Sequence, residues 1–371
     1  MTDLPENADE VLFDSRPTAV QGKHIGYACL NRPKALNALN LNMCQLLLDQ
    51  FRRWAADEQI VAVVLHAAGD KGFSAGGDVA TVVRHVRGGA PDRYVYGDSF
   101  FDVEYTLDKL IHRYPKPMIT YAHGVCMGGG VGLSVGGSHR IVADRCRIAM
   151  PEIHIGLFPD VGGGYFLNRV PGGIGRVLAL TGLTINEADA CFAGLADYFV
   201  PYEQRAEIWE ALGEISWTGR ALADRQLVTR CLLSLHRRFK SGLPTTNLLQ
   251  YYDTWRFIAA QPGTDELLAA LQVAAGEDPY FEAAAKSLAG GSPTTAVIAD
   301  EYLRRTRQMS LTEVLDLDLI MARQFQRHHD FPEGVRALLI DKDKRPQWEA
   351  ASLDAVDPQT VARHFQPLDA R

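Results

Sequence analysis

The sequence predicts an α/β fold with a helical C-terminal region, and three observations support this prediction. Short apolar runs of strand length alternate with segments of helical periodicity in the first part of the chain. Beyond about residue 200 the apolar pattern is mainly helical. The length of 371 residues corresponds to two domains, or to one large domain with an extension. We therefore expect an α/β core over residues 20–200 and a helical region over residues 201–371.

The individual elements are predicted in chain order from apolar runs and the Gly and Pro residues that interrupt them. Strands are expected over residues 24–30, 60–66, 117–122, 140–143 and 147–149. A helix is expected over residues 43–54, and a second, apolar helix after the glycine-rich turn that follows the third strand. In the C-terminal region, helices are expected over residues 203–212, 221–239, 264–275 and 295–325.

Composition and charge exclude several classes of protein. The chain has 38 Lys and Arg against 45 Asp and Glu, a net charge of −7, which disfavours nucleic-acid binding through phosphate neutralisation. No apolar stretch reaches the roughly 18 residues of a membrane span. The N-terminal segment is acidic and lacks the features of a secretory signal or a transit peptide, which predicts a cytoplasmic protein. The six cysteines are scattered and are expected to be free thiols, without a zinc site or a disulfide framework.

Two glycine-rich loops are candidates for an oxyanion hole. The first, residues 73–78, follows the predicted strand 60–66, and its small residues allow the backbone to approach a ligand closely. The second, residues 124–130, leads into a predicted helix, whose first N–H groups stabilise negative charge. One backbone N–H group from each loop forms the expected hole.

A third loop, residues 150–164, carries two acids in apolar surroundings. Glu152 and Asp160 each follow a proline, which stiffens the backbone at these positions. The neighbouring apolar side chains are expected to desolvate both carboxyl groups and to make them stronger bases near neutral pH. Taken alone, a glycine-rich turn is usually only a turn and an acid in a loop is usually solvated. The combination near predicted strand ends is more specific, because α/β folds place their sites there.

Other motifs point to chemistry that we do not expect here. Ser134 lies in a G-x-S-x-G pattern, but it falls inside the predicted helix and not on a strand-to-helix turn, so we do not expect a nucleophile. The sequence has no P-loop, Rossmann or H-E-x-x-H motif, and no metal site is expected. His123 and His154 border the three loops, where structural roles are the simpler expectation.

The sequence from about residue 24 to residue 200 resembles the crotonase (enoyl-CoA hydratase/isomerase) superfamily. The motifs that carry the resemblance are residues 31–39, 73–78 and 123–130. Residues 150–167, 330–337 and 340–348 are in addition similar to the 3-hydroxyisobutyryl-CoA hydrolase family within it. The resemblance is weakest between residues 200 and 290.

The resemblance implies a spiral of repeated ββα units and a site for an acyl-CoA thioester. By their positions in the motifs, Gly77 and Gly129 provide the two oxyanion-hole N–H groups. Glu104 matches an acid that contacts substrate in the hydrolase subgroup. The positions that match its CoA-binding segments are Lys34, Ala35, Leu36, Ala75, Gly76 and Asp78.

The acids distinguish the reactions of the superfamily. By this resemblance, the hydratases of the superfamily use two glutamates. One of them matches Glu152, whereas the position of the other is occupied here by Gly132, which has no side chain. Hydratases have glycine where this chain has Asp160. The resemblance therefore implies hydrolysis of a short 3-hydroxyacyl-CoA, such as 3-hydroxyisobutyryl-CoA of valine catabolism, with Glu152 acting as nucleophile or general base. The alternatives are another crotonase reaction, such as hydration or isomerisation, and a catalytically silent CoA-binding protein.

The expected partner is the acyl-CoA substrate, and no cofactor is expected because CoA belongs to the substrate. The superfamily resemblance implies a trimer or a pair of trimers, whereas the long C-terminal region leaves a monomer as the other possibility. Four basic residues near the C-terminal end are expected to be solvated rather than bound to CoA phosphates: His328, His329, Lys342 and Lys344.

Overall fold

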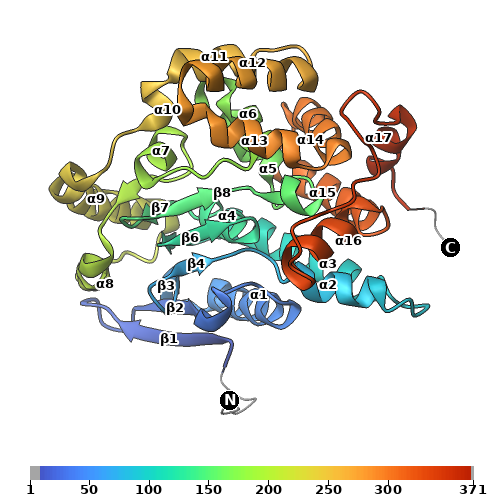
Figure 1. Cartoon of the computed structure of the whole chain (residues 1–371). Helices are drawn as coiled ribbons and strands as arrows, with labels where there is room; N and C mark the ends of the chain where they lie inside the picture. Colours follow the sequence, from blue (N-terminus) through green and yellow to red (C-terminus); the bar gives the residue numbers. More distant parts are fainter. Residues whose placement is uncertain (1–8, 369–371) are drawn as a thin grey trace.

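The computed structural model describes residues 9–368 and consists of a two-sheet core surrounded by helices (Figure 1). The first eight residues, which contribute to the prediction of a cytoplasmic protein, lie outside the described residues. The larger sheet has the strand order β1-β2-β3-β5-β7-β9. Its strands are β1 Val11–Pro17, β2 His24–Leu30, β3 Ile60–Ala67, β5 Met118–Ala122, β7 His139–Val142 and β9 Tyr198–Phe199. All pairings except the β1–β2 hairpin are parallel.

A second, three-stranded parallel sheet has the order β4-β6-β8. Its strands are β4 Gly72–Ser74, β6 Val125–Met127 and β8 Arg147–Ala149. Each short strand follows a long strand of the larger sheet, and helices follow in turn, so the chain repeats a ββα unit. This arrangement agrees with the predicted α/β core. The three residues of β4 and of β6 are too few to give a strand periodicity, so the sequence analysis missed them.

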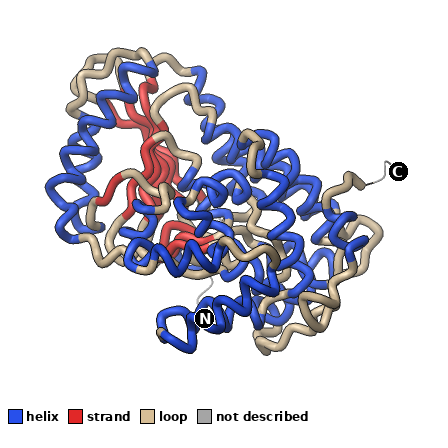
Figure 2. Tube along the Cα trace, turned by 90° about the horizontal axis from the view of Figure 1, so that it is seen from above, coloured by secondary structure: helices blue, strands red, loops and turns tan. Residues whose placement is uncertain are grey.

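Both faces of the larger sheet are buried. In β3, Ala62 and Val64 belong to an apolar cluster with helices α8 and α9, whereas Val63 and Leu65 belong to a second cluster with α1 and α3. Figure 2 shows the strands lying between helices on either side. Because side chains alternate across a strand, a strand that is covered on both faces is apolar at nearly every position. This accounts for the continuous apolar run at residues 60–65.

The helices of the core and of the C-terminal region have the following bounds. The first seven are α1 Leu41–Ala56, α2 Val79–Arg87, α3 Val95–His112, α4 Gly129–Val135, α5 Gly163–Phe166, α6 Ile174–Thr181 and α7 Glu187–Phe192. Those after residue 200 are α8 Arg205–Gly213, α9 Ala221–Phe239, α10 Asn247–Gln250, α11 Tyr252–Ala259, α12 Thr264–Glu277, α13 Glu282–Gly290, α14 Pro293–Thr306, α15 Leu311–Phe325, α16 Asp330–Val335 and α17 Pro358–His364. A π-helical turn at Arg336–Ile340 follows α16.

The predicted helix over residues 295–325 is wrong as a continuous element, because the structure divides it into α14 and α15. Ser310 begins α15: its side chain accepts from the Glu313 backbone, and the Glu313 side chain accepts from the Ser310 backbone. This capping box was readable in the sequence as Ser310-Leu-Thr-Glu313. The other strand and helix predictions correspond to observed elements: residues 24–30, 147–149 and 221–239 have the predicted bounds, and the rest have ends shifted by a few residues. The domain boundary near residue 200 stays a prediction, and one apolar cluster extends from Val11 to Phe365.

Two further findings concern residues 9–368. No helix there combines the length and the apolar character that crossing a membrane requires. Within the same range, no group of three or more His, Cys, Asp and Glu side chains is placed to hold a metal ion. All six cysteines are free thiols, as predicted.

Candidate active site

The parallel register of the small sheet brings the three predicted loops together. Strands β4, β6 and β8 lie side by side in the same direction, so the residues that follow them meet at one edge of the sheet. Residues 75–78 follow β4, Gly128 and Gly129 follow β6, and residues 150–152 follow β8. The loops are therefore neighbours in space, although up to 77 positions separate Ala75 from Glu152 in the chain.

These loops surround a cavity of about 290 Å³. Gly77, Gly129, Glu104, Glu152 and Asp160 all line it, so the structure brings together the five residues expected to do the chemistry. The remaining walls are mainly apolar and consist of Ala75, Gly76, Val79, Phe100, Phe101, Met127, Gly128, Pro151, Ile155, Leu157, Leu338 and Leu339. A cavity of this size and polarity suits a short acyl chain.

The backbone nitrogens of Gly77 and Gly129 lie close together at this cavity. A Cβ atom on Gly129 would lie 3.4 Å from the Gly77 nitrogen, and a Cβ atom on Gly76 would lie 3.6 Å from the Gly129 nitrogen. Within the described part of the chain, neither N–H group donates a hydrogen bond to another protein group. Gly129 is the first residue of α4, where helix N–H groups have no intrahelical acceptor. The two donors are therefore available to a ligand oxygen.

Any side chain at these glycines would fill the cavity. A Cβ atom on Gly129 would lie 2.5 Å from Glu104 Oε1, and one on Gly128 would lie 2.6 Å from Glu152 Oε1. Gly128 also adopts φ +49°, which disfavours residues with a side chain. The glycine-rich sequence is thus required by the close approach of the backbone to the two carboxyl groups.

The carboxyl groups of the site are buried, and none of them forms an ion pair with a basic side chain of residues 9–368. Glu104, Glu152 and Asp160 are each exposed by 5% or less. Burial raises the pKa of Glu152 well above its usual value, and the nearby Asp160 raises it further. The pKa of Glu104 is raised in the same way, by burial and by the charges of Asp160, Asp108 and Glu152. Burial raises the pKa of Asp160 to about 6, against the opposing effect of its hydrogen bond from Tyr105.

A hydrogen-bond network holds Asp160 and its loop in position. Tyr105 Oη donates to Asp160 Oδ2 at 2.6 Å. Two residues further on, the Gly162 N–H donates to Asp318 Oδ2 at 2.8 Å, and Tyr302 Oη donates to Asp318 Oδ1 at 2.5 Å. Asp318 belongs to α15 and Tyr302 to α14, so helices of the C-terminal region fix the loop that carries Asp160.

Position 132 has no room for a side chain. A Cβ atom on Gly132 would lie 2.6 Å from Cβ of Val161, the residue that follows Asp160. Val161 adopts φ +51°, an unusual conformation for a β-branched residue. Val161 therefore fills the space into which an acid at position 132 would extend.

Comparison with known proteins identifies the family. A sequence model of the enoyl-CoA hydratase/isomerase family matches residues 25–365. The chain is 34% identical over 369 residues to the Homo sapiens protein named 3-hydroxyisobutyryl-CoA hydrolase, mitochondrial, over 99% of this chain and 91% of the human one. It is 35% identical to the Danio rerio protein of the same name, over 98% and 91% of the two chains. The chain belongs to the enoyl-CoA hydratase/isomerase family.

Solved structures of this family share nearly the whole fold. An enoyl-CoA hydratase from Rhodobacter sphaeroides superposes with a TM-score of 0.83 at 34% identity and covers 97% of this chain and 98% of that one. A carnitinyl-CoA dehydratase from Mycobacterium thermoresistibile gives a TM-score of 0.84 at 32% identity, with 98% of both chains covered. Both matches include the C-terminal helices, and they confirm the crotonase-type α/β core with a helical C-terminal region.

The residues that match the CoA-binding segments of the family fall into three groups. Ala75 and Gly76 line the cavity. Lys34 and Ala35 are exposed in a 3-10 turn that ends at Leu36. This turn lies beside the cavity, since the Leu36 carbonyl accepts a hydrogen bond from the Ala75 N–H at 2.9 Å. The Asp78 side chain does not line the cavity: it accepts from the Thr81 backbone N–H at the start of α2. Its role as a substrate contact stays a prediction.

The other singled-out residues have structural partners. Ser134 is buried inside α4, as predicted. His123 Nε2 contacts the Gly69 carbonyl at 2.9 Å, and His154 Nε2 contacts Ser287 Oγ at 3.1 Å. His328 pairs with Glu349, and His329 contacts the Gln347 carbonyl. Lys342 and Lys344 are exposed, in agreement with the expectation.

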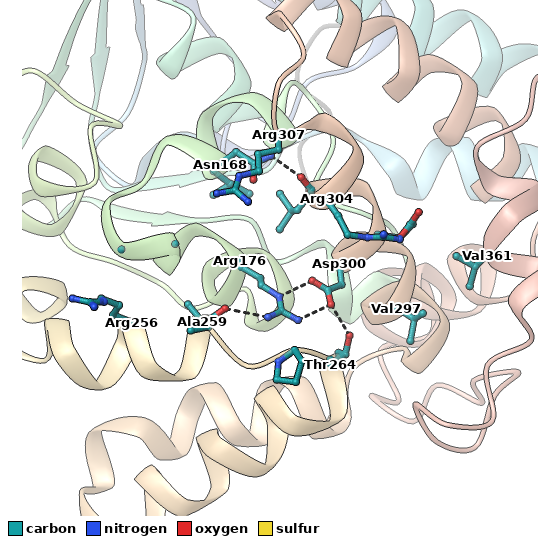
Figure 3. Close-up of a pocket in the computed structure, with 18 of the residues that line it drawn as sticks. Asn168, Arg176, Arg256, Ala259, Thr264, Val297, Asp300, Arg304, Arg307 and Val361 are labelled. Carbon is teal, nitrogen blue, oxygen red and sulfur yellow. Dashed lines mark hydrogen bonds and ion pairs between the residues drawn. The ribbon is translucent and has the colours of Figure 1, made fainter.

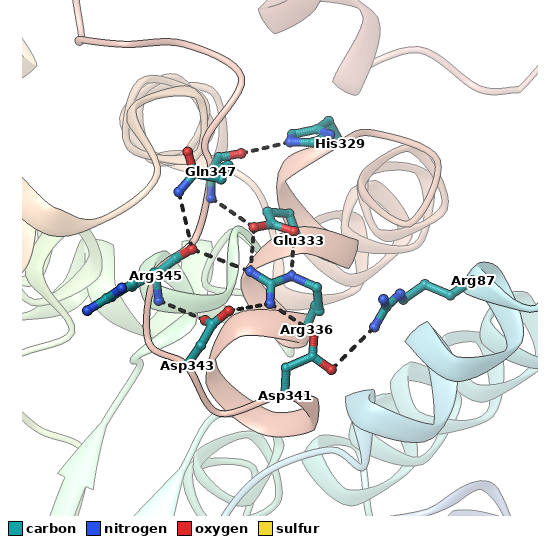
Figure 4. A network of polar contacts seen from close by, with 8 residues as sticks. All are labelled: Arg87, His329, Glu333, Arg336, Asp341, Asp343, Arg345 and Gln347. Carbon is teal, nitrogen blue, oxygen red and sulfur yellow. Dashed lines mark hydrogen bonds and ion pairs between the residues drawn. The ribbon is translucent and has the colours of Figure 1, made fainter.

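Residues 336–345 provide a wall of the cavity that was not predicted from the sequence; we call this segment the C-terminal strap. Its π-helical turn places Leu338 and Leu339 at the cavity. Figure 4 shows the contacts that hold it: Arg336 pairs with Glu333 at 2.8 Å and with Asp343 at 2.6 Å. The apolar pattern does not indicate this wall, because a π-helical turn has no distinct periodicity; the available signal was the family resemblance of residues 330–337 and 340–348. The contributions of Tyr105 and Asp108 were not predicted either. Both are buried residues of α3, one and four positions after Glu104.

A larger cavity, of about 1080 Å³, lies elsewhere in the family fold (Figure 3). It is lined by residues of α6, α11 and α14, and its centre is the ion pair of Arg176 with Asp300 at 2.6 Å. None of the residues predicted for catalysis or substrate binding lines it. Its size alone therefore does not make it the active site.

Proposed function

We propose that this chain hydrolyses the thioester of a short 3-hydroxyacyl-CoA, with 3-hydroxyisobutyryl-CoA as the substrate and 3-hydroxyisobutyrate and CoA as products. The observation that supports this most directly is the set of acids at the cavity. Glu152 and Asp160 face it together, whereas Val161 occupies the space beside Gly132 where a hydratase of this family has its second glutamate. The names of the human and zebrafish relatives support the same reaction.

The proposed reaction begins with the thioester carbonyl between the N–H groups of Gly77 and Gly129. Negative charge develops on this oxygen when the carbonyl carbon is attacked, and two fixed donors in a dry cavity stabilise it. Glu152 either attacks the carbonyl carbon itself or removes a proton from the water that attacks, and both routes give a tetrahedral intermediate. Collapse of this intermediate breaks the C–S bond, and CoA leaves as thiolate and takes up a proton. The water route gives the acid directly, whereas the first route gives an anhydride on Glu152, which water hydrolyses to release the acid and restore the Glu152 carboxylate.

Asp160 has a separate role in this proposal. Its Oδ2 atom is held by Tyr105, so the carboxyl group has a fixed orientation at the cavity. We assign it the hydrogen bond to the 3-hydroxyl group of the substrate. Glu104 is a further substrate contact, since its Oε1 atom is buried without a hydrogen-bond partner among the described residues. A buried polar atom without a partner gains most from a donor on the ligand.

The proposed hydrolysis needs only water and the acyl-CoA, so we propose no cofactor. The number of subunits stays a prediction: a trimer or a hexamer by family resemblance, or a monomer. Analytical ultracentrifugation measures it. The curated relatives are mitochondrial by name. A cytoplasmic location for this chain is therefore also a prediction, which fractionation of the source cells tests.

A second candidate is hydration of a 2-enoyl-CoA, because two solved structures at 32–34% identity carry hydratase or dehydratase names. Incubation with crotonyl-CoA and with 3-hydroxyisobutyryl-CoA distinguishes the two reactions. We expect free thiol only from the second substrate and no loss of the enoyl absorbance of the first. Hydration of crotonyl-CoA at a comparable rate, without thiol release from either substrate, would contradict the hydrolase proposal.

The first prediction concerns Glu152. Replacing it by Gln removes the base or nucleophile and keeps the shape, so we expect thiol release to fall by at least about 10²-fold. Binding of CoA, measured by calorimetry, should stay within about twofold, since the proposed mechanism places Glu152 at the acyl carbonyl and not at the CoA moiety. The matched control is Glu203→Gln, at an acid in the turn before α8 and outside this cavity. Single turnover in ¹⁸O-water tests for the anhydride route, because water that attacks the Glu152 carbonyl of an anhydride leaves label in the protein.

A further inference from the structure

Helix α3 carries three titratable side chains in one row. Glu104, Asp108 and His112 are four residues apart, a spacing that places side chains on one face of a helix. Glu104 lines the active-site cavity. Asp108 and His112 line a different cavity, of about 440 Å³. The row therefore leads from the active site into a second cavity.

The two cavities are neighbours, because three elements each contribute to both. Helix α3 gives Glu104 to the first and Asp108 to the second. Helix α4 gives Gly129 to the first and Gly132 to the second. In the third loop, Asp160 lines the first cavity and the adjacent Val161 lines the second. The two cavities are thus separated by one turn of α3, one turn of α4 and the step from residue 160 to residue 161 in the third loop.

Asp108 is an unusual residue in this partition. It is 4% exposed, and neither of its oxygens has a hydrogen-bond partner among the described residues. A buried carboxyl group without a partner is costly, so a role outside stability is expected of it. Asp108 Oδ1 lies 3.4 Å from the position that a Cβ atom on Gly132 would take. Asp108 therefore lies against α4 at Gly132, which also contacts Val161. The backbone of Val161 is strained, with φ +51°.

The groups around Asp108 favour proton transfer along this row. Burial raises the pKa of Asp108, and the charges of Asp160 and Asp318 raise it further, so it holds a proton more readily than an exposed aspartate. At the outer end, burial and the charges of Arg113 and Arg169 lower the pKa of His112, so this imidazole is neutral and releases a proton readily once it has received one. The charged residues that line the rest of the second cavity are Arg140, Arg169 and Asp197.

We propose that Asp108 and His112, with the second cavity, form a route for protons and water between the active site and solvent. Hydrolysis consumes one water and yields a carboxylic acid and a thiol. The acid ionises at neutral pH, so one proton leaves per turnover. While the acyl-CoA fills the first cavity, a separate route can supply the water and remove the proton. The proposal rests on the proposed hydrolase function and adds two residues to it.

The test uses Asp108→Ala in the full-length protein, with Asp102→Ala as the control on an exposed position of α3. We expect kcat for thiol release to fall by about 10-fold or more in Asp108→Ala, with KM and CoA binding within about twofold of the wild type. Formate, a small carboxylic acid that fits the space left by the side chain, should restore much of the loss. Wild-type kcat in Asp108→Ala, or a loss that formate does not reverse, overturns the route.

Asp108→Asn gives a second measurement that does not depend on a cavity being left in the fold. Asparagine keeps the shape but carries no titratable proton, so kcat should fall and its solvent deuterium isotope effect should rise. Thermal stability should not fall, because the variant removes a buried carboxyl group without a partner. An unchanged kcat with an unchanged isotope effect contradicts the proposal. A wild-type protein that releases no thiol overturns the proposed function and this inference together, whereas active wild type with unaffected variants overturns only the inference.

Discussion

At the scale of single residues, the pair Gly132 and Val161 determines which acids are available to the substrate. The two residues are distant in sequence, but a side chain at position 132 would overlap Val161. Glu152 and Asp160 are left as the acids of the third loop at the cavity, and both are buried. The sequence indicated the missing glutamate at position 132, whereas the side chain that fills its place became visible only in the structure.

This overlap makes a prediction about stability. Gly132→Ala should lower the free energy of unfolding by about 1–3 kcal/mol, because the new methyl group overlaps Val161 in a packed region. The double variant Gly132→Ala with Val161→Gly should be more stable than the sum of the two single losses predicts, since glycine removes the overlap and accepts φ +51°, while each single loss includes its own packing cost. Denaturant unfolding of the four proteins of the cycle measures the coupling. Additive effects of the two substitutions would show that the residues do not share this space.

At the scale of elements, the site depends on segments that local sequence patterns describe poorly. Strands β4 and β6 have three residues each, yet their register determines which loops meet. Strand β3 and helix α1 were predicted closely, because a buried strand and an amphipathic helix each have a clear period. The C-terminal strap was not predicted, since ion pairs of Arg336 hold it and its backbone follows no regular period.

The strap leads to a prediction about acyl-chain preference. Leu338 and Leu339 form a wall of the active-site cavity and are 38% and 39% exposed. Replacing both by Ala enlarges the cavity, so kcat/KM for a longer 3-hydroxyacyl-CoA should rise about 10-fold relative to that for the short substrate. Steady-state kinetics with a series of chain lengths measures this ratio. The control is Leu249→Ala, at an exposed leucine of α10 outside the cavity. An equal change for all chain lengths would mean that the wall does not set the preference.

At the scale of the whole molecule, the C-terminal helices complete the site that the α/β core begins. Asp318 of α15 and Tyr302 of α14 hold the loop behind Asp160. Helix α15 also packs along α3, which carries Glu104 and Asp108. The result is a set of buried carboxyl groups from three regions of the chain, without a basic side chain among the residues that line the active-site cavity.

This acid cluster predicts how stability depends on pH. The pKa of Asp160 rises from 3.8 to about 6 on folding, so the folded state binds more protons than the unfolded state between these two values. Stability should therefore fall as the pH rises from about 4 to about 6, by about 3 kcal/mol for Asp160 alone. Asp160→Asn should remove this part of the pH dependence and be relatively more stable above pH 6. Thermal melts of both proteins from pH 4 to pH 8 test it, and a difference that stays constant over this range would argue against the prediction.

The sequence by itself determined the α/β core, the three loops and their candidate acids, because apolar periodicity, glycine runs and proline-flanked carboxylates are local patterns. It also determined the family, through motifs that are continuous in the chain. Only the tertiary structure decided that these loops share one cavity, that the strap closes one side of it, and that Asp108 stands between two cavities. Those features depend on the pairing of very short strands and on contacts between residues far apart in the chain, and no local pattern encodes such distances.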